Sequence, residues 1–235
     1  MNKGKLYLIP SPLGDYPPEQ VIPQGTLERL RSLKLFVVEE IRTARRYLSA
    51  AGLRGQIDGL EFHELNEHTA PGDISALLSL FDRGDVGLIS EAGLPAVADP
   101  GAALVALCHR EGIQVVPFSG PSSLMLALMA SGLDGQSFAF RGYLPAKGDE
   151  RKAAIRRVEK DSSSLRQTQI FIETPYRNDS LMKDLTEGLA PSTRLCVAAD
   201  LTLPEPLIRC AEVSCWRKHP LQIGKRPCVF LILAK

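Results

Sequence analysis

The sequence predicts a two-part α/β fold, in which a mostly parallel sheet with helices on both faces precedes a mixed α+β sheet. Strand-like and helix-like segments alternate up to about Gly120, which is typical of a parallel sheet covered by helices. The early strand-like segments are short, apolar and rich in β-branched residues, as buried parallel strands are. Near the C-terminus, three strand-like segments follow one another with little helix between them, which indicates a mixed or antiparallel sheet. The predicted domains are residues 1–119 and 120–235.

The first part alternates between the two patterns. Apolar, β-branched or proline-ended segments predict strands, and apolar residues at helical spacing predict helices. The predicted strands are residues 5–10, 35–40, 86–90 and the start of 113–123, and the predicted helices are residues 25–33, 42–52, the segment ending at 111, and 122–132.

The second part begins with the same alternation and ends in strands. The predicted strands are residues 137–145, 170–175, 194–200, 207–213 and 228–235, and the predicted helices are residues 148–161 and 176–189.

Composition excludes several classes of protein. The 235 residues carry a net charge of +1, so no global charge signature of nucleic-acid binding is present. The sequence has no apolar stretch long enough to span a membrane, and the apolar run near the N-terminus is too short for a signal peptide. Five cysteines without CxxC spacing, and four histidines without HxxxH spacing, predict neither a disulfide framework nor a metal site. We therefore expect a cytoplasmic protein without a membrane segment.

The segment "SEAGLPAVADPG", residues 90–101, connects a predicted strand to a helix through more turn residues than a simple turn needs. Gly93 permits a close approach of the backbone to a ligand, and N–H groups around it suit a carboxylate or phosphate. Asp99 is a candidate helix cap with Pro100 at the first helical position. Such a loop lies where ligands bind in open α/β sheets, although a purely structural connection explains it equally well.

Three further proline-containing turns follow predicted strands, at residues 10–15, 119–123 and 173–177. Neither GxGxxG nor GxxxxGK[ST] is present, so the usual nucleotide-binding loops are absent from the sequence. Each turn taken alone is explained as a stiff connection, whereas these three turns and the segment 90–101 together could form the wall of a cleft.

Seven motifs in chain order resemble those of the tetrapyrrole (corrin/porphyrin) methylase superfamily, and within it are most similar to the branch of small-subunit ribosomal RNA cytidine 2′-O-methyltransferases. The resemblance extends from Leu6 to about Asp200. The motifs are "YLIPSPLGD", "VEEIRTARRYL", "FHELNE", "LISEAGLPAVADPG", "VVPFSGPSSLMLALMASGL", "FRGYLPAKGDER" and "IFIETPYR".

The resemblance implies two α/β domains, with S-adenosylmethionine bound in the cleft between them, and a homodimer. Residues 1–119 would provide the acceptor side and part of the cofactor site, and residues 120–235 the rest. The cofactor contacts implied by the matching motifs are Pro12, Leu13, Glu91, Ala92, Gly93, Leu94, Val97, Ala98, Ser122, Ser123, Ile172, Thr174, Leu201 and Pro227.

The acceptor hydroxyl of such a reaction must lose its proton to a nearby side chain. Four residues in the motifs "VEEIR" and "HELNE" match the acidic and arginine positions of the branch: Glu39, Arg42, Asn66 and Glu67. We expect Glu39 or Glu67 to activate the acceptor, and Arg42 and Asn66 to hold it. The alternative is that Glu39, Arg42 and Glu67 form a structural ion-pair network.

The basic segment "KGDERKAAIRR" also has two interpretations. Its cations either lie on a solvated surface helix or follow RNA phosphates. They are Lys147, Arg151, Lys152, Arg156 and Arg157.

The expected function is therefore S-adenosylmethionine-dependent ribose 2′-O-methylation of small-subunit ribosomal RNA, with the RNA or the small ribosomal subunit as partner. Glu40, Ile41 and Leu203 stand where the branch pattern has aspartate, threonine and lysine. These departures leave two alternatives: methylation of a tetrapyrrole or another small acceptor, and a non-catalytic module that binds S-adenosylmethionine.

Overall fold

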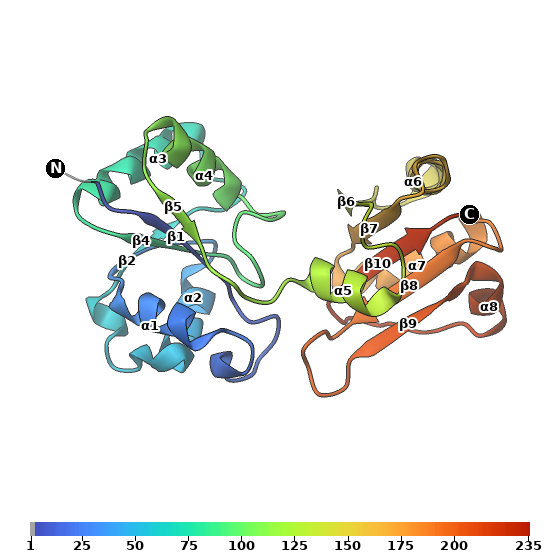
Figure 1. The fold of residues 1–235 in the computed structure, drawn as a ribbon, viewed down its shortest axis with the longest axis horizontal. Coiled ribbons are helices and arrows are strands. Elements are labelled where there is room, and N and C mark those ends of the chain that lie inside the picture. Colours follow the sequence, from blue (N-terminus) through green and yellow to red (C-terminus); the bar gives the residue numbers. More distant parts are fainter. Residues whose placement is uncertain (1–2) are drawn as a thin grey trace. The chain divides into compact units, whose positions relative to one another are not determined.

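The computed structural model describes residues 3–235, which form two compact units that divide between Ser122 and Ser123. Each unit contains its own five-stranded sheet (Figure 1). Within residues 3–235, no helix combines the length and the apolar character needed to cross a membrane.

Unit 1 alternates strands with helices, as its sequence pattern predicts. Its elements are β1 (Leu6–Ile9), η1 (Pro18–Gln20), α1 (Gln24–Ser32), β2 (Leu35–Val38), α2 (Ile41–Leu48), η2 (Ser49–Leu53), η3 (Ile57–Gly59), β3 (Glu61–Glu64), α3 (Pro71–Ala76), η4 (Leu77–Asp82), β4 (Val86–Ile89), α4 (Gly101–Arg110) and β5 (Val115–Pro117).

The sheet of unit 1 is parallel throughout, with the order β3-β2-β4-β1-β5. Alternate residues of β1 point to opposite faces, so that Tyr7 and Ile9 join one apolar cluster and Leu6 joins another. Helices α1 and α2 pack on the first face, and η4 and α4 pack on the second (Figure 1). Because the strands are parallel, their carboxyl ends all lie at one edge of the sheet.

Unit 2 has the elements α5 (Ser123–Ser131), β6 (Phe138–Tyr143), α6 (Gly148–Leu165), β7 (Thr168–Ile172), η5 (Pro175–Arg177), α7 (Asn178–Gly188), β8 (Arg194–Ala199), β9 (Leu207–Glu212), α8 (Val213–Lys218) and β10 (Cys228–Leu233). The strand order is β6-β7-β10-β8-β9; β6 and β7 are parallel, and the other neighbouring pairs are antiparallel. The predicted fold class, a parallel α/β sheet followed by a mixed α+β sheet, is confirmed.

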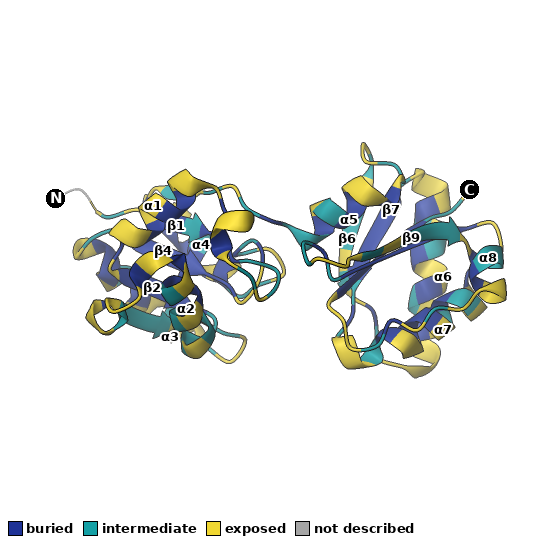
Figure 2. Cartoon of the chain, turned by 90° about the horizontal axis from the view of Figure 1, so that it is seen from below, coloured by how far each residue is buried: buried dark blue, intermediate teal, exposed yellow. Residues whose placement is uncertain are grey.

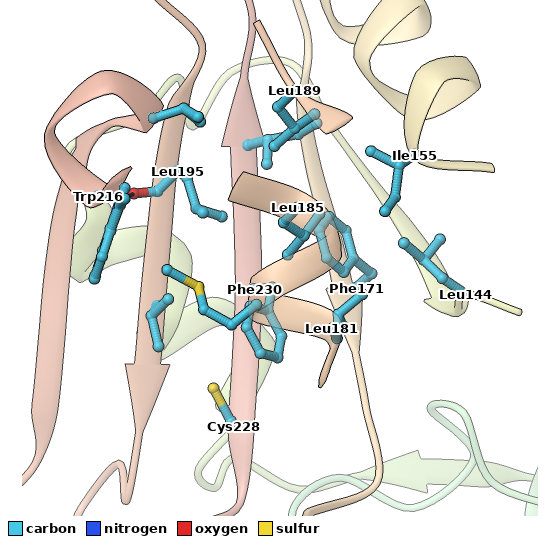
Figure 3. Packing of buried hydrophobic residues seen from close by; sticks show 14 of the residues in the cluster. Leu144, Ile155, Phe171, Leu181, Leu185, Leu189, Leu195, Trp216, Cys228 and Phe230 are labelled. Atoms are coloured by element: carbon cyan, nitrogen blue, oxygen red, sulfur yellow. Dashed lines mark hydrogen bonds between the residues drawn. The ribbon is translucent and has the colours of Figure 1, made fainter. Parts of the chain in front are cut away.

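The core of unit 2 lies between its sheet and helices α6, α7 and α8, and α5 covers the other face (Figure 2). Phe171 and Phe230 stack with their ring centroids 5.9 Å apart. Trp216 is fully buried, and its Nε1 donates to the Leu195 carbonyl at 2.9 Å (Figure 3). Trp216 is the only tryptophan of the sequence, so its fluorescence reports on this core alone.

Candidate functional site

The order of the parallel strands creates a switch point between β1 and β4. The two strands are neighbours, but the chain leaves β1 toward α1 on one face and leaves β4 toward α4 on the other. The two loops therefore diverge from adjacent carboxyl ends, which is where ligands bind in open α/β sheets. Two of the four predicted contact loops, residues 10–15 and 90–101, follow these two strands.

The two loops are joined by a backbone bridge. Ser11 N–H donates to the Gly93 carbonyl at 2.8 Å, and Gly93 N–H donates to the Ser11 carbonyl at 3.1 Å. The buried Ser11 hydroxyl donates to the Ser90 carbonyl at 2.8 Å. The N–H of Gly93 itself is therefore committed to the bridge, so the N–H groups expected to meet a ligand are those of its neighbours in the loop. The bridge fixes the start of the β4 loop.

The β4 loop holds unusual backbone conformations beyond the bridge. Gly93 has a φ of 77°, and two residues with side chains, Ala96 and Ala98, have φ values of 65° and 57°. Left-handed φ at non-glycine residues costs about 1–3 kcal/mol and clusters at binding sites. Asp99 Oδ1 accepts the N–H of Ala96 at 3.2 Å and of Gly101 at 2.6 Å, which stabilises the loop and the start of α4. Pro100 precedes the first helical residue, so its predicted place inside the helix is wrong by one position.

Gly93 is also closely surrounded. A Cβ atom at this position would lie 3.3 Å from Leu13 Cδ2 and 3.6 Å from the Pro121 carbonyl oxygen. The Leu13 side chain thus contacts the β4 loop from the β1 loop. Two of the predicted contact loops touch at this point.

A hollow of about 260 Å³ lies beside this contact, wholly within unit 1. Four of the predicted cofactor contacts line it, namely Pro12, Leu13, Glu91 and Ala92. Apolar surface from the β1 loop and the Glu91 carboxylate occur together there. This combination suits a ligand with an apolar chain and an ammonium group, which are both features of S-adenosylmethionine. The remaining lining residues are Ser11, Gly14, Asp15, Tyr16, Pro18, Thr43, Arg46, Tyr47 and Ala50.

Glu39 lies directly after β2 and is tied to the β4 loop, because β2 and β4 are neighbours. Its Oε2 accepts the N–H of Glu91 at 3.1 Å. Burial raises the pKa of Glu39 above its ordinary value, and the negative charges of Asp99 and Glu91 add to this effect. A carboxylate of raised pKa at the carboxyl edge of a sheet accepts a proton more readily than an ordinary glutamate does.

The other predicted catalytic residues lie farther along the same edge but do not contact Glu39. Arg42 is exposed on the first turn of α2. In the β3 loop, Asn66 Oδ1 accepts the N–H of His68 at 3.0 Å, and exposed Glu67 is 3.6 Å from His68 Nε2. Across the part of the chain that the structure describes, no ion pair joins Glu39, Arg42 and Glu67. The structural ion-pair network considered from the sequence is therefore wrong.

Glu40, which departs from the branch pattern, caps α2. Its carboxylate accepts the N–H of Arg42 at 2.8 Å, and the N–H and hydroxyl of Thr43, both at 2.6 Å. These hydrogen bonds, led by that of the Thr43 hydroxyl, lower the pKa of Glu40. The longer side chain thus serves as a helix cap at the position of the expected aspartate.

Unit 1 also contains Leu94, Val97, Ala98 and Ser122 from the predicted cofactor set. Val97 is 47% exposed although it is apolar. Ser122 directly follows the β5 loop, whose Gly120 has no room for a side chain, because a Cβ would lie 2.2 Å from Pro10 Cβ. The β5 loop is thereby held against the start of the β1 loop.

Unit 2 contains the remaining predicted cofactor residues in three places. Ile172 ends β7 and Thr174 follows it, whereas Ser123 begins α5. Leu201 and Pro227 belong to neighbouring segments, because Asp200 N–H donates to the Pro227 carbonyl at 3.1 Å. Left-handed φ values at Asp200 and Thr202, 53° and 71°, flank the largely buried Leu201.

The β7 loop is supported by a buried ionic network that the sequence interpretation missed. Arg151 was expected in a basic surface segment, yet it is fully buried and lies 3.3 Å from Glu173 Oε2. Arg151 also donates to the Pro145 carbonyl at 2.8 Å and to Asp184 at 3.0 Å. Helical periodicity could have revealed this, because Arg151 shares the buried stripe of α6 with Ile155 and Val158.

Glu173 connects this network to the loop itself. Its Oε1 accepts the N–H of Thr174 at 2.8 Å and bonds Arg177 Nη2 at 2.7 Å. Burial alone would raise the pKa of Glu173, but the hydrogen bonds from Arg177 and Thr174 outweigh it and the pKa is lowered. The carboxylate therefore stays charged and anchors the loop.

A family profile described as tetrapyrrole (corrin/porphyrin) methylases matches residues 5–211 of this chain. Relatives named "Ribosomal RNA small subunit methyltransferase I" include those of Escherichia coli O157:H7, Vibrio cholerae and Pseudomonas aeruginosa, at 30%, 34% and 31% identity. The matches cover 98%, 84% and 99% of this chain, and 78%, 65% and 79% of the respective relatives.

Solved structures of similar fold include the methyltransferase CobJ and diphthine synthase, both with a TM-score of 0.67 and 17% identity. The similarity covers 98% of this chain and 94% of CobJ, and 99% of this chain and 90% of diphthine synthase. At this identity the two structures establish a shared fold.

Proposed function

The chain belongs to the family of tetrapyrrole (corrin/porphyrin) methylases, and we propose that it transfers a methyl group from S-adenosylmethionine to a ribose 2′-hydroxyl of small-subunit ribosomal RNA. The names of the relatives support the RNA substrate, and the motif resemblance supports the ribose hydroxyl. The observation that carries the proposal is the bridge between Ser11 and Gly93 at the switch point, with the Glu39 carboxylate bonded to the same loop.

Members of this family use S-adenosylmethionine, which supplies an electrophilic methyl group when bound. In unit 1, the contacts that we propose are Pro12, Leu13, Glu91, Ala92, Gly93, Leu94, Val97, Ala98 and Ser122. In unit 2, we propose Ser123, Ile172, Thr174, Leu201 and Pro227.

On the acceptor side, Glu39 would take the proton of the attacking hydroxyl. Its raised pKa makes it a better base than an ordinary glutamate, and the Glu91 N–H holds one carboxylate oxygen in place. The exposed cation of Arg42 would hold a phosphate next to the target ribose. We assign Asn66 and Glu67 to the same set of acceptor-side residues. A movement of the β3 loop would bring their side chains to the ribose.

We further propose that residues 1–119 provide the acceptor side and part of the cofactor site, and that residues 120–235 provide the rest. A homodimer belongs to the same proposal, on the basis of the motif resemblance. A cytoplasmic location also belongs to it, because the proposed substrate is part of the ribosome.

The test is methyl transfer from labelled S-adenosylmethionine to small ribosomal subunits from a strain that lacks this gene, beside wild-type subunits. Label is expected only in the subunits from the deletion strain, because wild-type subunits already carry the methyl group. No label in either, with cofactor binding shown by calorimetry, would overturn the proposal for assembled subunits. A small acceptor or a non-catalytic binding role would then take its place.

Once the wild-type protein is shown to be active, variants can assign the roles of the residues on the acceptor side. Glu39→Ala, Asn66→Ala and Glu67→Ala should lower the rate of transfer while cofactor binding is retained. Lys34→Ala serves as the control, because this exposed side chain lies before β2, at the opposite edge of the sheet.

A further inference from the structure

Two exposed tyrosines lie at the carboxyl edge of the β6–β7 pair in unit 2. Tyr143 ends β6 and pairs in register with Ile172, the last residue of the parallel strand β7. Tyr176 follows four residues later in η5, so that both rings come from the same edge of the sheet. Their exposed fractions are 58% and 70%, although tyrosine rings are largely apolar.

Arg177 lies beside the Tyr176 ring. Its guanidinium is 5.2 Å from the centroid of that ring, and Nη1 is 3.4 Å from the Tyr176 hydroxyl. Tyr143 belongs to the same edge, because its backbone pairs with Ile172, and the chain continues from Ile172 into the segment that holds Tyr176 and Arg177. The two tyrosines and the arginine therefore form one cluster at the carboxyl edge of these two strands.

The cluster rests on the buried ionic network. Arg177 Nε and Nη2 bond Glu173 Oε1 at 2.9 and 2.7 Å, and the other Glu173 oxygen faces Arg151. Both Arg151 and the Glu173 side chain are fully buried, so the base of the cluster is rigid. A surface that is already ordered loses little conformational entropy when a ligand binds.

The neighbouring loop adds positive charge. Asn178, the residue after Arg177, donates through Nδ2 to the carbonyls of Gly224 and Arg226 at 3.0 and 2.8 Å. This contact brings the backbone on both sides of Lys225 to the residue after Arg177, and the Lys225 side chain is exposed. Arg226 is 3.5 Å from Asp200 and is partly neutralised, whereas Lys225 forms no ion pair within residues 3–235.

We propose that Tyr143, Tyr176 and Arg177 form a stacking surface for an unpaired nucleobase of single-stranded RNA, with Lys225 near the adjoining phosphate. Exposed aromatic faces beside an arginine plane bind unstacked bases, and a nearby cation attracts the backbone. The inference rests on the proposed RNA substrate and adds to it a place where RNA is held. Neither tyrosine belongs to the buried apolar cluster of unit 2, and both leave more than half of their surface accessible to a ligand with a flat face.

The test uses the full chain and a short single-stranded RNA that carries 2-aminopurine, whose fluorescence is quenched when it stacks on an aromatic ring. Tyr176→Ala and Tyr143→Ala are each expected to weaken binding roughly 5- to 150-fold and to abolish the quenching. Tyr176→Phe should retain both, because it keeps the ring. Leu165→Ala is the matched control, since this apolar residue is 59% exposed. It ends α6 just before β7 begins, whereas the cluster lies at the other end of β7.

Three results would overturn the stacking surface. The first is unchanged RNA binding and quenching in the two alanine variants. The second is a loss in Tyr176→Phe as large as in Tyr176→Ala, which would assign the effect to the hydroxyl. The third is a change of molecular mass in Tyr176→Ala during sedimentation, because the rings would then form a protein contact.

Methyl transfer by the wild-type protein separates this proposal from the proposed function. If the wild-type protein methylates small subunits and the tyrosine variants match it in transfer and RNA binding, only the stacking surface fails. If the wild-type protein neither binds the RNA nor methylates subunits, both proposals fail.

Discussion

Glu39 and Glu173 both follow a strand directly, yet their surroundings change their acidity in opposite directions. Glu39 is half-buried near the carboxylates of Asp99 and Glu91, and its pKa is raised. Glu173 is buried against Arg151 and Arg177, and its pKa is lowered. The first environment favours proton uptake and the second keeps a permanent charge. We therefore expect Glu39 to take part in proton transfer and Glu173 to anchor the β7 loop.

The pH dependence of methyl transfer tests the role of Glu39. A base must be deprotonated, so the rate should rise as the pH passes through the raised pKa of Glu39, above the range of an ordinary glutamate. Asp99→Asn removes a negative charge but keeps the oxygen that accepts the Ala96 and Gly101 N–H groups. It should therefore lower the pKa of Glu39 and shift the rise to lower pH.

Glu39→Gln is the companion variant for that measurement. It should lose the pH-dependent rise and reduce the rate by about 10²–10⁴-fold. An unchanged pH profile in both variants would exclude Glu39 as the base.

Arg151→Met tests the buried network. Removing one partner of a buried ion pair costs up to about 3–5 kcal/mol. Here Glu173 Oε2 loses its partner, while Oε1 keeps its bonds to Arg177 and Thr174. Denaturant unfolding followed by Trp216 fluorescence should show this loss for unit 2. The double variant Arg151→Met/Glu173→Leu should recover much of it, since an apolar pair leaves no buried charge. Equal losses in both variants would mean that Arg151 contributes through packing alone.

At the scale of elements, the position of the site follows from strand order. Placing β4 between β2 and β1 brings the β1, β2 and β4 loops to one edge of the sheet. The bridge between Ser11 and Gly93 and the contact between Glu39 and Glu91 both depend on this order. The loops can therefore act as one binding surface, although they are distant in sequence.

Gly93→Ala is expected to disturb that surface. The new Cβ must adopt a positive φ, which costs about 1–2 kcal/mol, and it would press on Leu13 Cδ2. The affinity for S-adenosylmethionine, measured by calorimetry, should fall at least about tenfold. Gly112→Ala is the control, because Gly112 also has a positive φ, of 66°, but its Cβ would meet open space. Equal cofactor affinities for the two variants would count against the β4 loop as the binding loop.

At the scale of the whole molecule, the chain contains separate cores. The apolar clusters of unit 1 and of unit 2 share no residues, and each surrounds its own sheet. A single free energy of unfolding therefore does not describe this chain unless the two units unfold together.

We expect residues 123–235 to fold when produced alone. This segment contains the complete β6-β7-β10-β8-β9 sheet and the helices on both of its faces. Its Trp216 emission should match that of the full chain in wavelength and should shift cooperatively in denaturant. Emission typical of water-exposed tryptophan would show that unit 2 needs unit 1 in order to fold.

The sequence by itself determined the alternation of strands and helices, the change from a parallel to a mixed sheet, and the motifs that place the chain in its family. Burial periodicity and turn chemistry act over a few residues, so local segments carry this information. Cys108, Cys196 and Cys228 lie in apolar segments and are buried for the same reason.

Only the tertiary structure decided which of these segments meet. The Glu39 carboxylate reaches an N–H 52 residues away, because β2 and β4 are neighbours in the sheet. Arg151 is buried rather than exposed, because Glu173 and Asp184 approach it from other elements. Strand order and ion pairing depend on the free energy of contacts between distant residues, which no local pattern encodes. For that reason the elements could be predicted from the sequence, whereas the geometry of the site could not.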